Sequence, residues 1–132
     1  MASIHKEFLI NAPVDEVWKA VCDVGAVHQR LVPGVLTDAR LDGDARIVTF
    51  ANGMVVREVV VDLDHKKRRF VYAAKDGGLT THHNASWQLF DDGKGGTRFV
   101  WISDFLPGEV AEPIQALVDK GSEVMKQTLE KK

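Results

Sequence analysis

The chain has 132 residues and a formal charge of −2, with 17 Lys and Arg against 19 Asp and Glu. Hydrophobic residues make up 45% of it and charged residues 27%, a balance typical of a folded globular protein. The length predicts a single domain over residues 1–132, and the near-neutral charge argues against nucleic-acid binding. Because Cys22 is the single cysteine and no apolar run is long enough to span a membrane, we expect a cytoplasmic protein without a metal centre.

The N-terminal part of the sequence predicts one strand followed by two helices. Apolar and polar residues alternate over residues 3–11, which is the period of a strand with one buried face. Pro13 then suits the start of a helix, and apolar residues follow it at helical spacing: Val14, Val17, Trp18, Val21 and Cys22. Cys22 is therefore expected to be an unreactive core residue. A short second helix is expected over residues 27–31.

The middle of the chain predicts an antiparallel sheet, and its end predicts a long helix. Hydrophobic residues recur with a period of two in six segments, namely 35–41, 45–51, 54–63, 68–75, 80–91 and 96–106. Short turns rich in Asp, Asn and Gly separate these segments and favour a meander. A helical period then runs from about residue 110 to residue 130. This order of elements predicts an α+β fold.

Several local motifs accompany this order: 10–18 (INAPVDEVW), 43–46 (GDAR), 52–53 (NG) with 57–58 (RE), 62–64 (DLD) with Arg69 and Tyr72, and 97–101 (TRFVW). Together they resemble the helix-grip superfamily, which includes polyketide cyclase/dehydrase and lipid-transport proteins, START-like domains and proteins of the birch-pollen-allergen type. The resemblance implies a curved seven-stranded antiparallel sheet wrapped around the long C-terminal helix, with two short helices after the first strand. It also implies a cavity between sheet and helix.

An arginine and a glutamate are expected to face each other across one predicted hairpin. With a turn at residues 51–53, Arg46 stands opposite Glu58, on the face that also carries Val48 and Val56. One interpretation is a polar anchor on the cavity floor that holds a ligand's carboxylate or hydroxyl group. The other, which we favour, is a structural ion pair, because a one-residue slip in register would turn both side chains outward.

Two adjacent histidines, His82 and His83, resemble a metal pair but point to opposite faces of a strand, so a single ion cannot bind to both. The resemblance favours His83 as the cavity residue, in phase with Ala85 and Trp87. In that position, its imidazole could be a general base, a hydrogen-bond donor to a carbonyl group or a structural core residue.

The last predicted strand can face the core in either of two phases. In one phase Val100 and Ile102 point inward, and Asp104 with them, so that Asp104 could orient His83 for proton abstraction beside a ketone. In the other phase Asp104 lies in solvent, and the inward side chains are Phe99, Trp101, Ser103 and Phe105. The sequence does not choose between these phases.

One glycine lies on the apolar stripe of the last predicted helix. A mid-helix glycine costs roughly 1 kcal/mol relative to alanine, so Gly121 indicates either a close approach of helix and sheet or space left for a ligand. The strand phases, the helix stripe and the family resemblance together give the expected ligand-binding residues. These are Arg46, Val48, Val56, Glu58, Tyr72, His83, Ala85, Trp87, Leu117 and Gly121.

Three functions follow as expectations. The leading one is binding of a small hydrophobic or amphipathic ligand, such as a lipid, a polyketide-like molecule or an aromatic compound, by a monomer or homodimer without a cofactor. The second is a polyketide cyclase, aromatase or dehydratase that uses His83 and Asp104 for acid–base catalysis. The third is a protein-interaction module of the chaperone-associated type, which would have a filled core and an exposed apolar patch.

Overall fold

The computed structural model describes residues 1–131. Its elements in chain order are β1 (Ala2–Ile10), α1 (Val14–Cys22), the 3-10 turn η1 (Val24–Ala26), α2 (Val27–Arg30), β2 (Leu36–Asp42), β3 (Ala45–Phe50), β4 (Val55–Asp64), β5 (Arg69–Lys75), β6 (His82–Asp91), β7 (Thr97–Leu106), the 3-10 turn η2 (Gly108–Val110) and α3 (Ala111–Glu130). The expected helices and strands are all present, with ends that differ by one or two residues.

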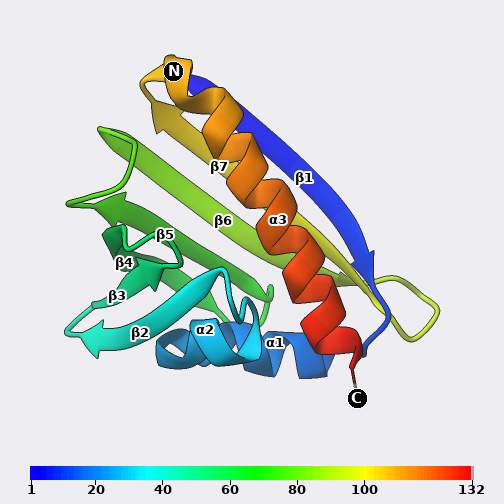
Figure 1. Ribbon diagram of the computed structural model, residues 1–132. Helices are drawn as coiled ribbons and strands as arrows, with labels where there is room; N and C mark the ends of the chain where they lie inside the picture. The colour runs from blue at the N-terminus through cyan, green and yellow to red at the C-terminus, as the bar shows by residue number, and fades with distance from the viewer. Residues whose placement is uncertain (132) are drawn as a thin grey trace.

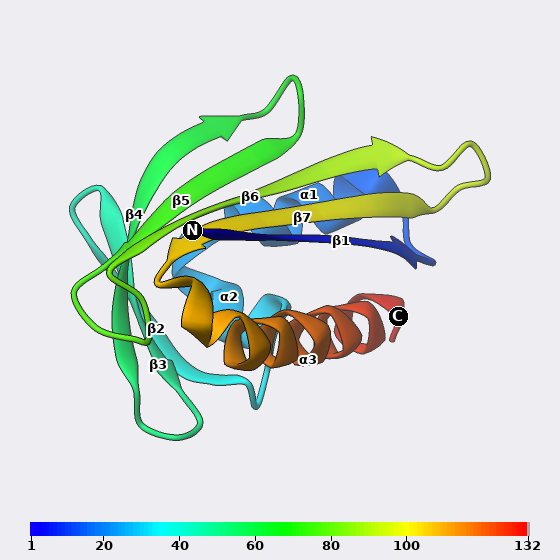
Figure 2. The same ribbon diagram turned by 90° about the horizontal axis from the view of Figure 1, so that it is seen from above.

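The seven strands form one antiparallel sheet in the order β1-β7-β6-β5-β4-β3-β2. Figure 1 shows α3 lying along one side of this sheet, and Figure 2 shows the sheet bending around the helix. The strand β4 contains a bulge between Val60 and Asp62, where an extra residue increases the local bend. The predicted helix-grip arrangement is therefore confirmed.

The hairpin between β3 and β4 sets the register that the site depends on. Gly53 at its turn has a φ of +90°, a conformation that favours glycine. The Asn52 side-chain oxygen accepts a hydrogen bond from the backbone N–H of Met54 at 2.9 Å. With this turn in place, Arg46 pairs directly with Glu58, as the sequence predicts.

The short helices α1 and α2 lie together near one end of the sheet (Figure 1). Pro13 precedes the first turn of α1, and Asp15 and Glu16 follow it, where negative charge complements the positive end of the helix dipole. Val17 and Val21 on its inner face are fully buried. The helix is anchored to the core by these apolar residues.

Cys22 packs against the edge of the core rather than lying fully within it, as the sequence led us to expect. Its side chain is only half-buried, and its Sγ lies 3.6 Å from His65 Nδ1. The same ring nitrogen accepts a hydrogen bond from Trp18 Nε1 at 3.2 Å. Partial burial raises the pKa of the Cys22 thiol, so the thiol remains protonated at neutral pH.

The main core fills the space between the concave side of the sheet and α3. Its largest fully buried apolar side chains include Phe70, Phe99, Phe105 and Met125. The helix buries one stripe of residues: Ile114, Val118, Gly121, Ser122, Met125 and Leu129. This stripe has the helical period that the sequence predicts.

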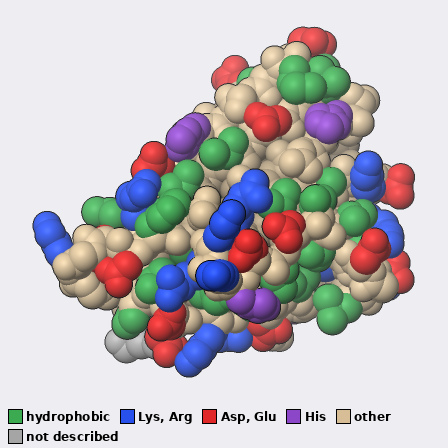
Figure 3. Space-filling view, turned by 180° about the vertical axis from the view of Figure 1, so that it is seen from behind, with side chains coloured by type: hydrophobic (Ala, Val, Ile, Leu, Met, Phe, Trp, Pro, Cys, Tyr) green, Lys and Arg blue, Asp and Glu red, His purple; other side chains and the backbone are tan. Residues whose placement is uncertain are grey.

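The side of the molecule seen from behind Figure 1 carries mixed side chains. Lys and Arg alternate there with Asp and Glu, and apolar side chains lie between them (Figure 3). The concave side, with α3 against it, is instead the apolar side. Among residues 1–131, no helix is both long and apolar enough to cross a membrane.

Candidate functional site

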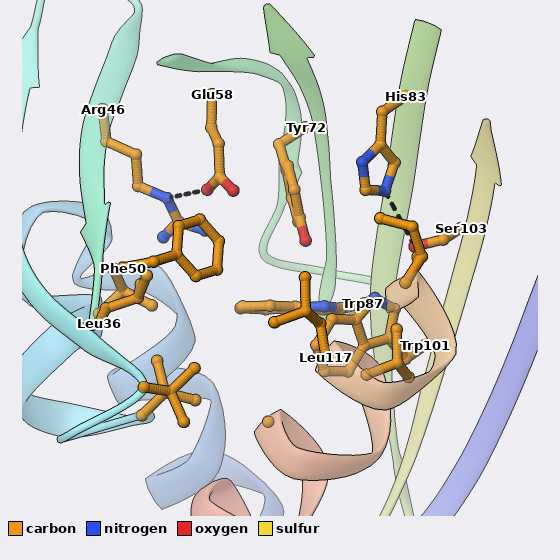
Figure 4. A pocket seen from close by; sticks show the side chains of 16 residues that line it. Leu36, Arg46, Phe50, Glu58, Tyr72, His83, Trp87, Trp101, Ser103 and Leu117 are labelled. Atoms are coloured by element: carbon orange, nitrogen blue, oxygen red, sulfur yellow. Dashed lines mark hydrogen bonds and ion pairs between the residues drawn. The ribbon is translucent and has the colours of Figure 1, made fainter. Parts of the chain in front are cut away.

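A cavity of about 90 Å³ lies between the sheet and α3. The helices and the ends of β2 and β3 supply an apolar wall that includes Val27, Leu36, Phe50, Ile114, Leu117 and Val118. The strands supply the polar side chains, and Figure 4 shows these pointing into the same space as Phe50 and Leu117. The cavity is therefore apolar on its helix side and polar on part of its sheet side.

The polar side chains stand in register on adjacent strands. One cross-strand row joins Arg46 on β3, Glu58 on β4, Ala74 on β5 and His83 on β6. Cross-strand partners point to the same face, so the methyl group of Ala74 separates a carboxylate from an imidazole. The next row follows the same pattern, with a small central residue between two polar ones: Tyr72, Ala85 and Ser103.

Arg46 borders the cavity, but nearly all of its side chain is enclosed by the protein. It is 2% exposed, its Nε donates to Glu58 Oε1 at 2.8 Å, and a terminal nitrogen donates to the Val24 carbonyl at 3.3 Å. Its guanidinium carbon also lies 5.1 to 5.7 Å from the centres of three aromatic rings, those of Phe70, Tyr72 and Trp87. Arg46 thus holds Glu58 in position and compensates its charge.

His83 and Tyr72 are both held in their neutral forms. Burial lowers the pKa of His83, and the nearby negative charge of Glu58 opposes that shift. Burial raises the pKa of the Tyr72 hydroxyl well above its usual range, and Glu58 raises it further. His83 Nε2 lies 3.3 Å from Ser103 Oγ, which fixes the ring in place. The neutral imidazole and the neutral phenol can each donate one hydrogen bond to a ligand.

Two tryptophans form the part of the wall nearest to α3. The rings of Trp87 and Trp101 meet edge to face with centroids 5.4 Å apart. Both indole Nε1 atoms are buried, and neither has a hydrogen-bond partner among residues 1–131. A Cβ atom on Gly121 would lie 3.2 Å from the Trp101 ring, so the helix approaches the sheet closely there. Gly121 also lines the cavity.

The sequence-predicted binding residues fall into three groups. Most of them line the cavity: Arg46, Glu58, Tyr72, His83, Trp87, Leu117 and Gly121. Val56 lines a smaller adjoining hollow of about 50 Å³. Val48 and Ala85 are buried on the same face but do not line the cavity. Phe50 and Ser103 line it and were not among the predicted binding residues.

Of the two strand phases that the sequence leaves open, the one that places Asp104 beside His83 is wrong. His83 pairs with Phe105 on the inner face of the sheet, whereas Asp104 pairs with Asn84 on the outer face. The second phase of β7 is the correct one, with its inward side chains all buried: Phe99, Trp101, Ser103 and Phe105. Asp104 therefore cannot orient His83, and Ser103 contacts the imidazole instead.

Residues 1–131 contain no group of three or more His, Cys, Asp or Glu side chains arranged to hold a metal ion. His82 is exposed and His83 lines the cavity, which follows from their adjacent positions on one strand. The polar side chains that line the cavity can form hydrogen bonds and transfer protons.

Solved structures share this fold at low sequence identity. XoxI from Bacillus cereus has a TM-score of 0.88 at 17% identity, over 99% of this chain and 97% of that one. A START superfamily protein from Mycobacterium smegmatis has a TM-score of 0.76 at 13% identity, over 97% and 94% of the two chains. Norcoclaurine synthase from Thalictrum flavum has a TM-score of 0.75 at 20% identity, over 98% and 84%.

No curated protein sequence matches the chain. A family model does match it, over residues 1–131, and that family is described as polyketide cyclase / dehydrase and lipid transport. The match covers all seven strands and α3, which together build the cavity. The chain therefore belongs to the polyketide cyclase / dehydrase and lipid transport family.

Proposed function

We propose that the chain binds a small, mostly apolar organic molecule in the cavity between the sheet and α3. The observation that carries this proposal is the composition of the lining, in which apolar side chains surround a few convergent polar groups. Binding sites for small molecules have this composition, because the apolar wall supplies affinity and the polar groups fix orientation. Family membership supports the same function.

The size of the cavity favours a ligand built around one ring. Its volume of about 90 Å³ is far below the roughly 300–1,000 Å³ of pockets for drug-sized ligands. The adjoining hollow of about 50 Å³ shares Phe50, Glu58 and His83 with it. A small shift of the shared side chains joins the two spaces, and a single aromatic ring then fits.

A longer ligand needs more room than these two spaces provide. An outer groove of about 470 Å³ lies beside the cavity and includes Pro33, Lys120 and Val124. Val35, Phe50 and Leu117 line both the groove and the cavity. A lipid or a polyketide-like chain would therefore enter only if side chains of this shared wall moved aside.

Thermal unfolding in the presence of toluene tests the proposal. A ligand that binds only the native state raises the midpoint of unfolding in proportion to the logarithm of its concentration. We expect this rise for the unmodified protein and a smaller one for Leu117→Phe, which fills the cavity. The matched control is Gln127→Phe, at an exposed position of the same helix. A midpoint independent of toluene concentration would contradict the proposal.

A second candidate function is proton transfer, supported by the neutral His83 that faces the Glu58 carboxylate across Ala74. Glu58 would take a proton from the carbon beside a ketone, and a neutral donor would stabilise the enolate oxygen until the proton returns. Cyclopentanone in D₂O is a suitable probe, because deuterium enters its α positions on each exchange. We expect His83→Gln to slow this exchange, with His82→Gln as the matched control. Exchange at the buffer rate would contradict this candidate.

The third function class, a protein-interaction module, predicts a filled core. The cavity in this structure argues against that expectation, so we do not propose this function.

A further inference from the structure

The charges at the cavity floor are arranged asymmetrically. Arg46 directs its guanidinium at Glu58, at the Val24 carbonyl and at surrounding aromatic rings, and it is almost fully buried. Glu58 uses only Oε1 for this pair. Its second oxygen has no hydrogen-bond partner among the described residues and lies on the side of Tyr72 in Figure 4. Glu58 is also the more accessible of the two, with 11% of its side chain exposed against 2% for Arg46.

A hydrogen-bond donor stands next to this carboxylate. Tyr72 lies between Glu58 and His83 in Figure 4, with its hydroxyl directed into the cavity. It is a diagonal cross-strand neighbour of both, because Ala74 pairs with each of them and Tyr72 is two residues earlier on β5. Within residues 1–131 its hydroxyl makes no hydrogen bond to another side chain or to the backbone.

One ligand group satisfies both side chains. A neutral hydroxyl donates its proton to the free oxygen of Glu58 and accepts a hydrogen bond from Tyr72 through a lone pair. A methyl group in the same place leaves both protein groups unpaired. A carboxylate has no proton to donate to Glu58, finds Arg46 already paired and loses its own hydration on entry.

We infer that the cavity selects small ring compounds that carry a neutral hydroxyl group and discriminates against ring carboxylates. The inference rests on the proposed function, because it names the ligand class of the same site. It differs from the sequence-based expectation of an anchor for either a carboxylate or a hydroxyl, since Arg46 is already engaged by Glu58 and the Val24 carbonyl.

Three probes of similar shape test the inference: toluene, phenol and benzoate. Toluene and phenol differ only in a methyl group against a hydroxyl. The indole N–H signals of Trp87 and Trp101 report binding in a proton–nitrogen NMR titration, because both rings line the cavity. Trp18 serves as the internal reference, because it does not line the cavity and its N–H is bonded to His65.

We expect phenol to bind roughly 10- to 100-fold more tightly than toluene, the usual gain from a hydrogen bond to a charged group. Benzoate should bind more weakly than toluene. If toluene shifts the two indole signals but phenol binds no more tightly, or benzoate binds most tightly, the inference is overturned and the proposed function stands. If none of the probes shifts them, the proposed function is overturned and the inference with it.

Two variants test whether Tyr72 and Glu58 cause the preference for phenol over toluene. Tyr72→Phe keeps the ring and removes the hydroxyl, so the ratio of toluene to phenol dissociation constants should fall toward one. Glu58→Gln should lower the same ratio, although it leaves Arg46 without its charged partner. The control is Glu123→Gln, at an exposed position on α3, which should keep the ratio of the unmodified protein. A ratio that stays unchanged in Tyr72→Phe would overturn the assignment of this hydroxyl.

Discussion

Glu58 and His83 face each other across the methyl group of Ala74, in one cross-strand row of the sheet. The negative charge of Glu58 raises the pKa of His83, but burial lowers it by more, so the imidazole stays neutral. Ala74, the central residue of the row, has only a methyl side chain, so space remains open between Glu58 and His83 on the cavity side of the sheet. This row therefore places the carboxylate and the imidazole on the same side of the cavity.

The first prediction concerns the buried ion pair. Arg46→Met or Glu58→Leu alone should lower the free energy of unfolding by about 3–5 kcal/mol, because each leaves an uncompensated buried charge. The double variant should recover most of this loss, since apolar side chains of similar volume replace the pair. Urea unfolding of all three variants measures the effect.

The exposed pair of Arg98 and Glu7 supplies the control for that series. Its atoms are 2.8 Å apart, as in the buried pair, but both side chains are close to half exposed. Glu7→Gln should therefore leave the stability almost unchanged. A double variant of the buried pair that is no more stable than either single variant would contradict the account.

The second prediction is a loss of stability in weak acid. The pKa of His83 in the folded protein lies below its ordinary value of 6.5, so the unfolded chain binds more protons between those two values. The contribution of His83 to stability is thus fully present above pH 6.5 and declines as the pH falls through 6.5 toward the lower folded-state pKa. Urea unfolding across this range measures the decline.

The His83→Gln variant should lose this component of the pH dependence. His82→Gln and Asp104→Asn should change it only slightly, because both positions are outside the cavity and their charges shift the pKa of His83 less than burial and Glu58 do. An NMR titration of the His83 ring protons gives its pKa directly. A value at or above 6.5 would contradict the neutral imidazole assigned to this site.

The third prediction concerns Gly121. A leucine there would overlap the Trp101 ring and extend into the cavity, and overpacking of this kind costs about 1–3 kcal/mol. The better helix propensity of leucine offsets about 1 kcal/mol of that cost. Gly121→Leu should therefore be slightly destabilised and should bind toluene more than tenfold less tightly. Gln127→Leu, on the exposed face of α3, is the control, and equal toluene affinity in the two variants would be the contrary result.

The fourth prediction concerns ligand size. Leu117→Ala should connect the cavity with the outer groove, because Leu117 lines both. The variant should bind 2-naphthol, which has two rings, more tightly than the unmodified protein does. Titration of both proteins with phenol and 2-naphthol measures the change in preference. An unchanged preference would show that Leu117 does not limit the size of the ligand.

The register of the β3–β4 hairpin was predictable because the Asn-Gly turn has strict conformational requirements. That register places Arg46 opposite Glu58 without any tertiary information. The inward face of β6 was expected from the family resemblance, which favoured His83 in phase with Ala85 and Trp87.

The phase of β7 could not be predicted, because apolar residues occupy both of its faces. Val100 and Ile102 point outward there, whereas Phe99 and Trp101 point inward. The alternation of apolar residues therefore does not indicate which face of β7 points inward. For this reason the contact of Ser103 with His83 was missed. The contact of Cys22 with His65 was missed for another reason, since it joins residues that are distant in sequence.

The most direct test is to find where a bound ring lies. Nuclear Overhauser contacts from the ring protons of bound toluene identify the side chains that surround it. We predict contacts to Tyr72 from the sheet and to Val118 from α3, because both line the cavity. Contacts confined to Pro33 and Val124 would place the ligand in the outer groove and contradict the account.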